Sequence, residues 1–169
     1  EYLLDTALLT TPPHPEWSGA ALLDEDGRLV GVGSLLLQER VGDDVVDGNM
    51  FVPVDLLEPI LDDLVRTGRS AQPPRPWLGM YTTEIDNRLV VVGIASKGPA
   101  ARAELKTGDV ILAVNGDKVT SQVGFYRKLW SLGTAGVDVP LTVYHEGVTF
   151  DVVLSSIDRA RLLKAPQLH

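Results

Sequence analysis

The sequence predicts a mostly β protein with short helices (β/α+β), organised as two units. Short apolar runs bounded by Gly, Asn, Asp or Pro recur along the chain, and apolar residues follow helical spacing only over brief stretches. A polar, Pro-rich segment, residues 69–76, separates two such patterns, as linkers between domains do. The 169 residues are enough for one large or two small domains, and we expect the boundary at this segment.

The composition narrows the class of protein. With 44% hydrophobic residues the chain has a globular composition, and its formal net charge of −8 argues against nucleic-acid binding. It has no cysteine, which excludes disulfides and thiolate metal sites and suits an exported bacterial protein. No apolar run reaches the roughly 20 residues that span a bilayer. The chain begins at Glu1, so we expect a processed or engineered piece without its targeting signal.

In the first half, turn residues separate short strands. Prolines at positions 12, 13 and 15 predict a loop, and residues 24–27 predict a hairpin turn between two apolar strands. Residues 38–49 are acidic and loop-like, and residues 50–55 form a short strand pattern.

A helix is predicted after this strand. Asp55 and Glu58 have capping-box spacing, Pro59 falls within the first turn, and Gly68 is placed to end the helix. Its apolar positions are Leu56, Leu57, Ile60, Leu61, Leu64 and Val65.

The second half predicts strands at residues 77–82 and 88–94. A short helix with Pro99 at its first position precedes a strand that runs from the Gly108-Asp109 turn to Asn115-Gly116.

A further helix and a hairpin follow in this half. Residues 121–132 predict a helix with Phe125, Leu129 and Leu132 on one face. Residues 138–156 predict a hairpin around Glu146-Gly147, and the residues after it form a short helix or a frayed tail.

One stretch carries a family resemblance. Residues 98–116 read GPAARAELKTGDVILAVNG and resemble the core motif of bacterial PDZ domains, for which SPAAKAGLKPGDVILEVNG is typical. Glu104 stands where that motif has Gly, so the helix has to end without a glycine. The resemblance implies a PDZ domain at residues 73–157, followed by a C-terminal tail at residues 158–169.

A second resemblance covers residues 15–77. The segments EWSGAALLDEDGRLVGV and FVPVDLLEPILDDLVRTGRSAQPPRPWLGM are similar to the end of the trypsin-like domain of HtrA-type serine proteases. There, GNSGGPLLDLDGRVVGI is followed by AIPIDLVKPVLDQLIEYGKVIRPWLGI. The resemblance implies that residues 1–72 are the remnant of a trypsin-like second β-barrel with its C-terminal helix. Such strands have open edges, so we expect an upstream segment or other chains to associate with them.

The resemblance places Ser18 at the position of the catalytic nucleophile; the alternative is an ordinary turn serine. Glu16-Trp17 replaces the family's Gly-Asn and Ala21 its Pro, which alters the loop that forms the oxyanion hole. A serine needs a histidine base and an orienting carboxylate, which the family takes from an N-terminal barrel that this chain lacks. His14, His145 and His169 do not match that histidine, so we expect the chain alone to hydrolyse nothing.

A PDZ domain binds an extended peptide as an added strand and holds its terminal carboxylate with backbone N–H groups. The resemblance assigns this role to the loop and strand edge at Trp77, Leu78, Gly79, Met80 and Tyr81. Tyr126 and Trp130, four residues apart on the second predicted helix, either line the peptide groove or simply pack.

The resemblance implies the C-terminal part of an HtrA-like serine endopeptidase, a hydrolase of protein quality control in the bacterial cell envelope or periplasm. Its PDZ domain would bind extended peptides or apolar C-termini, and its protease domain would form trimers. The alternative is a degenerate protease that acts only as a peptide-binding module. We expect no cofactor and no metal, because residues 31–34 lack the lysine of a phosphate loop and the acidic residues 43–47 lack calcium-loop spacing.

Overall fold

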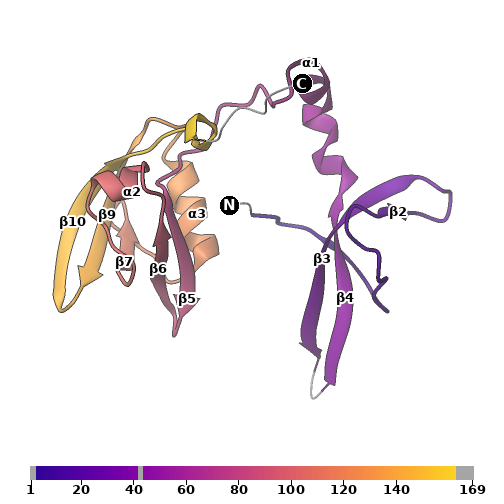
Figure 1. The fold of residues 1–169 in the computed structure, drawn as a ribbon, viewed down its shortest axis with the longest axis horizontal. Helices are drawn as coiled ribbons and strands as arrows, with labels where there is room; N and C mark the ends of the chain where they lie inside the picture. The colour runs from indigo at the N-terminus through magenta and orange to yellow at the C-terminus, as the bar shows by residue number, and fades with distance from the viewer. Residues whose placement is uncertain (1–2, 42–43, 163–169) are drawn as a thin grey trace. The chain divides into compact units, whose positions relative to one another are not determined.

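A computed structural model describes residues 3–41 and 44–162 of the chain. The chain divides into two compact units, Glu1–Ala71 and Gln72–His169, each with its own β-sheet (Figure 1). The predicted class, mostly β with short helices, is confirmed.

The N-terminal unit is a four-stranded antiparallel sheet in the order β1-β4-β3-β2. Its strands are β1 (Leu8–Thr10), β2 (Ala21–Leu23), β3 (Leu29–Val41) and β4 (Asp44–Pro53). The predicted turn between β2 and β3 is present, because the Gly27 N–H donates to the Asp24 carbonyl at 3.0 Å. β1 and β2 are the edges of this sheet.

The prediction of a loop is wrong for residues 38–41 and 44–49. β3 and β4 pair along these residues, with Gln38 opposite Asp47 and Leu36 opposite Asn49. The Gln38 amide also donates to the Asp47 carboxylate at 2.8 Å. Cross-strand pairing therefore outweighs the low strand propensity of the acidic residues. Asp43, one of the acidic residues considered for calcium, lies outside the described residues.

The predicted helix is divided into η1 (Val54–Leu56), η2 (Glu58–Ile60) and α1 (Leu61–Thr67). The predicted capping box is wrong, because none of the three segments has a side-chain cap hydrogen bond. Pro59 has no N–H to donate, so one continuous α-helix could not keep its full set of bonds here. Gly68 ends α1 as predicted, with φ of 72° and its N–H on the Leu64 carbonyl. β4 ends at Pro53, two residues earlier than expected.

The C-terminal unit is a six-stranded antiparallel sheet in the order β10-β9-β7-β6-β5, with β8 paired to β7. Its strands are β5 (Met80–Ile85), β6 (Arg88–Ile94), β7 (Val110–Val114), β8 (Asp117–Lys118), β9 (Asp138–His145) and β10 (Val148–Ser155). The predicted turns at Asn115-Gly116 and Glu146-Gly147 are confirmed by positive φ at all four residues. The start of the unit is also tied to its end, since Trp77 pairs with Ile157.

Three short helices complete this unit: α2 (Pro99–Arg102), α3 (Gln122–Ser131) and η3 (Arg159–Leu162). α3 begins after Ser121, whose hydroxyl accepts the Gly124 N–H at 3.1 Å. It packs against β5 and β7 and contributes Phe125 and Leu129, which are fully buried, to the core. Leu132, the third predicted core position, is only half-buried beyond the end of the helix.

The end of α2 explains how the chain manages without the expected glycine. Glu104 adopts φ of 59°, a left-handed conformation that costs an L-residue roughly 1–2 kcal/mol. Glu104→Gly should therefore raise the free energy of unfolding by about 1 kcal/mol, because the exposed carboxylate gives up no buried contact. Chemical denaturation measures this gain, and a variant less stable than the parent would contradict it.

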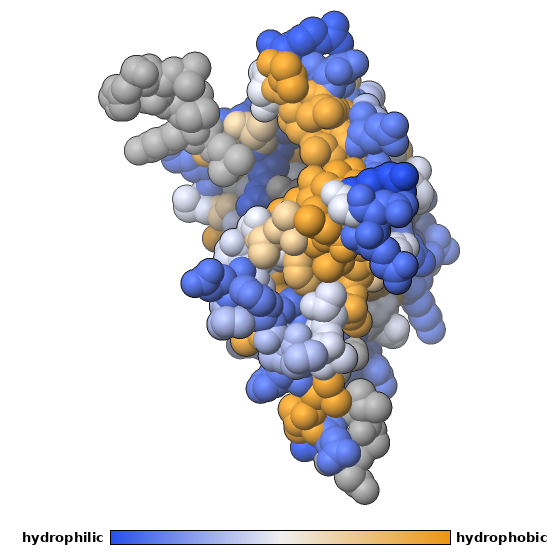
Figure 2. Space-filling model, turned by 90° about the vertical axis from the view of Figure 1, so that its right-hand side faces the viewer, coloured by the Kyte–Doolittle hydropathy of each residue, from blue (hydrophilic) through white to orange (hydrophobic). Residues whose placement is uncertain are grey.

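The N-terminal unit carries many exposed apolar side chains, and Figure 2 shows apolar residues gathered in a band over one face of it. They include Leu9, Leu23, Leu29, Val32, Leu35, Leu36, Val45, Leu56, Leu57, Leu61 and Val65. A contiguous apolar surface of this kind usually meets another protein surface. Within the part of the chain that the structure describes, no helix is long and apolar enough to cross a membrane.

Candidate functional site

Gly79 forms the turn that leads into β5. Its φ is 75°, its carbonyl accepts the Ala95 N–H at 2.8 Å, and it lies directly against Gly98. A Cβ at this position would be 2.8 Å from the Gly98 Cα and 3.3 Å from the Trp77 ring. Both the backbone angle and the contact therefore require glycine.

Two backbone N–H groups of this turn have no hydrogen-bond partner among the described residues. The Trp77 N–H donates to the Ile157 carbonyl at 3.0 Å, but the next two N–H groups, of Leu78 and Gly79, have no acceptor among the described residues. Consecutive N–H groups beside a left-handed residue form a concave anion-binding nest. The turn is therefore suited to a carboxylate.

The side chains of this segment are divided between two faces of the sheet. Trp77, Leu78 and Met80 are buried, with Leu78 and Met80 no more than 3% exposed, whereas Tyr81 is 42% exposed. Leu78 and Met80 thus belong to the core beneath the turn. Tyr81 lies on the opposite face, because successive side chains of a strand alternate.

β5 offers an open strand edge. It is the last strand of its sheet, with β6 on one side only. On the side away from β6, the Gln122 side-chain amide donates to the Thr82 carbonyl. The Glu84 carboxylate accepts the Gln122 backbone N–H at 2.7 Å. The backbone groups of Met80 face the same way as those of Thr82, because they alternate along a strand. Sequence reasoning missed Gln122 and Glu84, since no motif links positions 38 residues apart.

The two aromatic residues of α3 share one face, as predicted, and both are packed. Tyr126 is buried edge-on to Phe125 and stacked on Trp130, with ring centroids 5.3 Å apart. The Arg75 guanidinium covers the Trp130 ring at 4.1 Å. A role for Tyr126 and Trp130 in the groove remains a prediction.

Ser18 lies in an exposed turn of the N-terminal unit. The Ala20 N–H closes the turn on the Trp17 carbonyl at 3.0 Å, and Gly19 has φ of 73°. Gly19 and Ala20 both bond to the backbone of Gly33, which fixes the turn against β3. A Cβ on Gly33 would lie 1.8 Å from the Trp17 carbonyl oxygen, so this close approach requires glycine.

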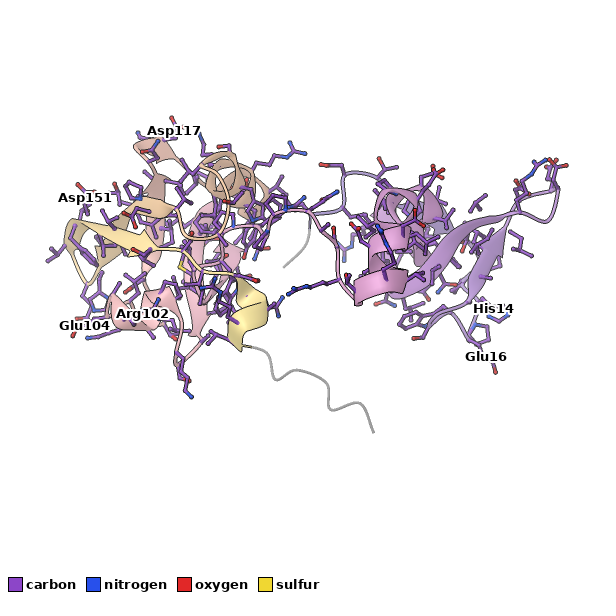
Figure 3. The ribbon with its side chains drawn as sticks, turned by 90° about the horizontal axis from the view of Figure 1, so that it is seen from above. His14, Glu16, Arg102, Glu104, Asp117 and Asp151 are labelled. Carbon is purple, nitrogen blue, oxygen red and sulfur yellow. The ribbon has the colours of Figure 1, made fainter. Side chains whose placement is uncertain are left out.

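No histidine serves Ser18 in the described part of the chain. The His14 ring accepts the Glu16 N–H at 3.1 Å, and its backbone N–H donates to Asn49 at 2.6 Å; Figure 3 shows His14 and Glu16 together at one edge of the unit. The His145 ring bonds to the buried Asp109 carboxylate at 2.6 Å, and His169 lies outside the described residues. Among the described residues, no group of three potential metal ligands comes together.

Comparisons with known proteins match this geometry. Residues 76–155 match the family model of the PDZ domain. The chain is 27% identical to "Serine protease Do-like HtrA" of Lactobacillus helveticus over 82% of its length, and 29% identical to "Probable periplasmic serine endoprotease DegP-like" of Chlamydia pneumoniae over 82%. These matches cover 37% and 30% of the relatives, so the chain spans about a third of their length.

Solved structures share the fold. "HtrA-type protease AlgW with decapeptide" is 20% identical with a TM-score of 0.56, over 82% of this chain and 45% of that one. The serine endoprotease from Yersinia pestis is 23% identical with a TM-score of 0.52, over 82% and 46%.

The sheet, α3 and the Gly79 turn define the C-terminal unit as a PDZ domain. With the relatives matched over both units, the predicted resemblance to an HtrA-type serine protease with a PDZ domain is confirmed.

Proposed function

We propose that the PDZ domain, residues 73–157, binds extended peptides through their C-termini. The peptide adds a strand to the outer edge of β5, and its terminal carboxylate accepts the N–H groups of Leu78 and Gly79. The observation that carries the proposal is that the N–H groups of Leu78 and Gly79, at the start of an open strand edge, have no acceptor among the described residues. A solved neighbour described as an HtrA-type protease with decapeptide supports a peptide as the ligand.

Titration of the ¹⁵N-labelled chain with a peptide ending in an apolar residue tests this proposal. The amide signals of Leu78, Gly79, Met80 and Thr82 should shift most, because these groups form the nest and the new strand pairing. Gln122 should also shift, since its amide occupies the Thr82 carbonyl that the added strand needs. Shifts centred on β10, the opposite edge of the sheet, would contradict this site.

For the N-terminal unit, residues 1–72, we propose the C-terminal part of a trypsin-like protease domain, with Ser18 at the nucleophile position. The missing N-terminal barrel would supply the catalytic histidine and aspartate and cover the exposed apolar side chains. The whole protein would be an endopeptidase of protein quality control in the bacterial periplasm and would assemble as a trimer. The relatives' names, which include periplasmic serine endoproteases, support this assignment. Residues 158–169 would be an appendage beyond the PDZ domain.

A second candidate is a PDZ module whose protease half is inactive. The residues before Ser18 favour it, because Glu16 and Trp17 occupy the loop that would form an oxyanion hole. Treating the full-length protein with a serine-directed phosphonate distinguishes the two. Labelling at Ser18 supports the enzyme, whereas intact peptide binding without labelling supports the module.

A further inference from the structure

A cavity lies beside Tyr81 of β5. It has a volume of about 290 Å³ and is lined by Trp77, Tyr81, Ala95, Ser96, Lys97, Arg159 and Leu162. η3, which contributes the last two residues, lies near the end of the sheet where β5 begins and β6 ends (Figure 1). All of these residues belong to the C-terminal unit.

The lining is rich in hydrogen-bond donors that have no acceptor. Neither Lys97 nor Arg159 forms an ion pair with another described residue, although the whole chain carries a net charge of −8. The Trp77 indole N–H is buried and has no hydrogen-bond partner in the described structure. A buried donor without an acceptor is rare in folded proteins. The two cations of the lining fit a carboxylate.

The position of the cavity relates it to a peptide on β5. Met80 and Thr82 are buried on the face of β5 that turns toward the core, whereas the exposed Tyr81 is part of the cavity wall. In a strand added beside β5, every second side chain points to the Tyr81 face. The side chain beside Tyr81 can therefore extend toward Lys97 and Arg159.

We propose that this cavity is a specificity pocket for an acidic side chain of the bound peptide. The pocket selects Asp or Glu at a position whose side chain lies on the Tyr81 face, and it is indifferent to positions on the α3 face. This inference rests on the proposed binding of peptides to β5 and names the class of peptide that binds best.

Paired peptides test the pocket. Two peptides with the same apolar C-terminus carry either Glu or Gln at each of the last four positions in turn, and fluorescence polarisation gives their affinities for the whole chain. At one position, or at two separated by one residue, Glu should bind about fivefold more tightly than Gln, the size of one well-placed exposed ion pair. Arg159→Gln and Lys97→Gln should each reduce this ratio.

Lys118→Gln serves as the matched control, because Lys118 is exposed on β8, outside the cavity lining. It should leave the ratio unchanged, and circular dichroism shows that each variant is folded. Equal affinities for Glu and Gln at every position, or a ratio that survives both pocket substitutions, would overturn the pocket while peptide binding stands. Failure of every peptide to bind would instead overturn the proposed function.

Discussion

Gly79→Ala should lower the free energy of unfolding of the C-terminal unit by about 3 kcal/mol. About 1–2 kcal/mol of this comes from placing an L-residue at a φ of 75°. The rest comes from overpacking, because the new methyl carbon would lie 2.8 Å from the Gly98 Cα, a backbone atom with little freedom to move. The same shift moves the Leu78 and Gly79 N–H groups, so the affinity for a C-terminal peptide should fall more than tenfold.

Gly116→Ala separates the two causes. Gly116 has a φ of 82°, but nothing lies within 4 Å of the added methyl group. Thermal or urea unfolding should therefore show a loss of only about 1 kcal/mol for this control, with peptide binding unchanged. Equal losses for the two variants would contradict the role given to the Gly79–Gly98 contact.

Gly33→Ala should detach the turn that presents Ser18. The added methyl group would lie 1.8 Å from the Trp17 carbonyl oxygen, so the backbone of one segment has to move. The two hydrogen bonds from the turn to Gly33 cannot survive that movement. We expect the N-terminal unit to lose about 3 kcal/mol of stability, and the Gly19 amide to exchange with solvent at least tenfold faster.

Val32→Ala is the control for this substitution, because Val32 is the preceding residue of the same strand and its side chain is 41% exposed. It should change the exchange rate of the Gly19 amide much less. Unchanged protection of that amide in Gly33→Ala, measured by hydrogen exchange and NMR, would contradict the account of the Ser18 turn.

Local chemistry was enough to predict most of the C-terminal unit. Turn residues with a required backbone conformation, such as Asn115-Gly116 and Glu146-Gly147, fixed the ends of its strands. The resemblance predicted a glycine turn at Gly79, and the structure shows that its contact with Gly98 requires glycine. Peptide binding at this turn stays a prediction. Hydrogen bonds between residues far apart in the sequence, such as the one between Gln122 and Thr82, could not be predicted from the sequence.

Two predictions for the N-terminal unit failed for different reasons. Acidic residues are poor strand formers and predict a loop at residues 38–49, yet pairing between β3 and β4 makes residues 38–41 and 44–49 part of a ladder. The helix after β4 was expected to be continuous because its apolar spacing is helical, but Pro59 interrupts the hydrogen-bond pattern. The cavity beside Tyr81 could not be predicted either, because its cations, Lys97 and Arg159, lie 62 positions apart and meet only in the folded unit.

The central claim is that backbone N–H groups at the Gly79 turn hold the terminal carboxylate of a peptide. The most direct test of this claim measures the affinity of one apolar peptide with a free C-terminal carboxylate. It compares this affinity with that of the same peptide carrying a C-terminal carboxamide. Hydrogen bonds to a charged acceptor contribute about 1.5–3 kcal/mol, so the carboxamide should bind at least tenfold more weakly. Equal affinities for the two peptides would contradict the claim.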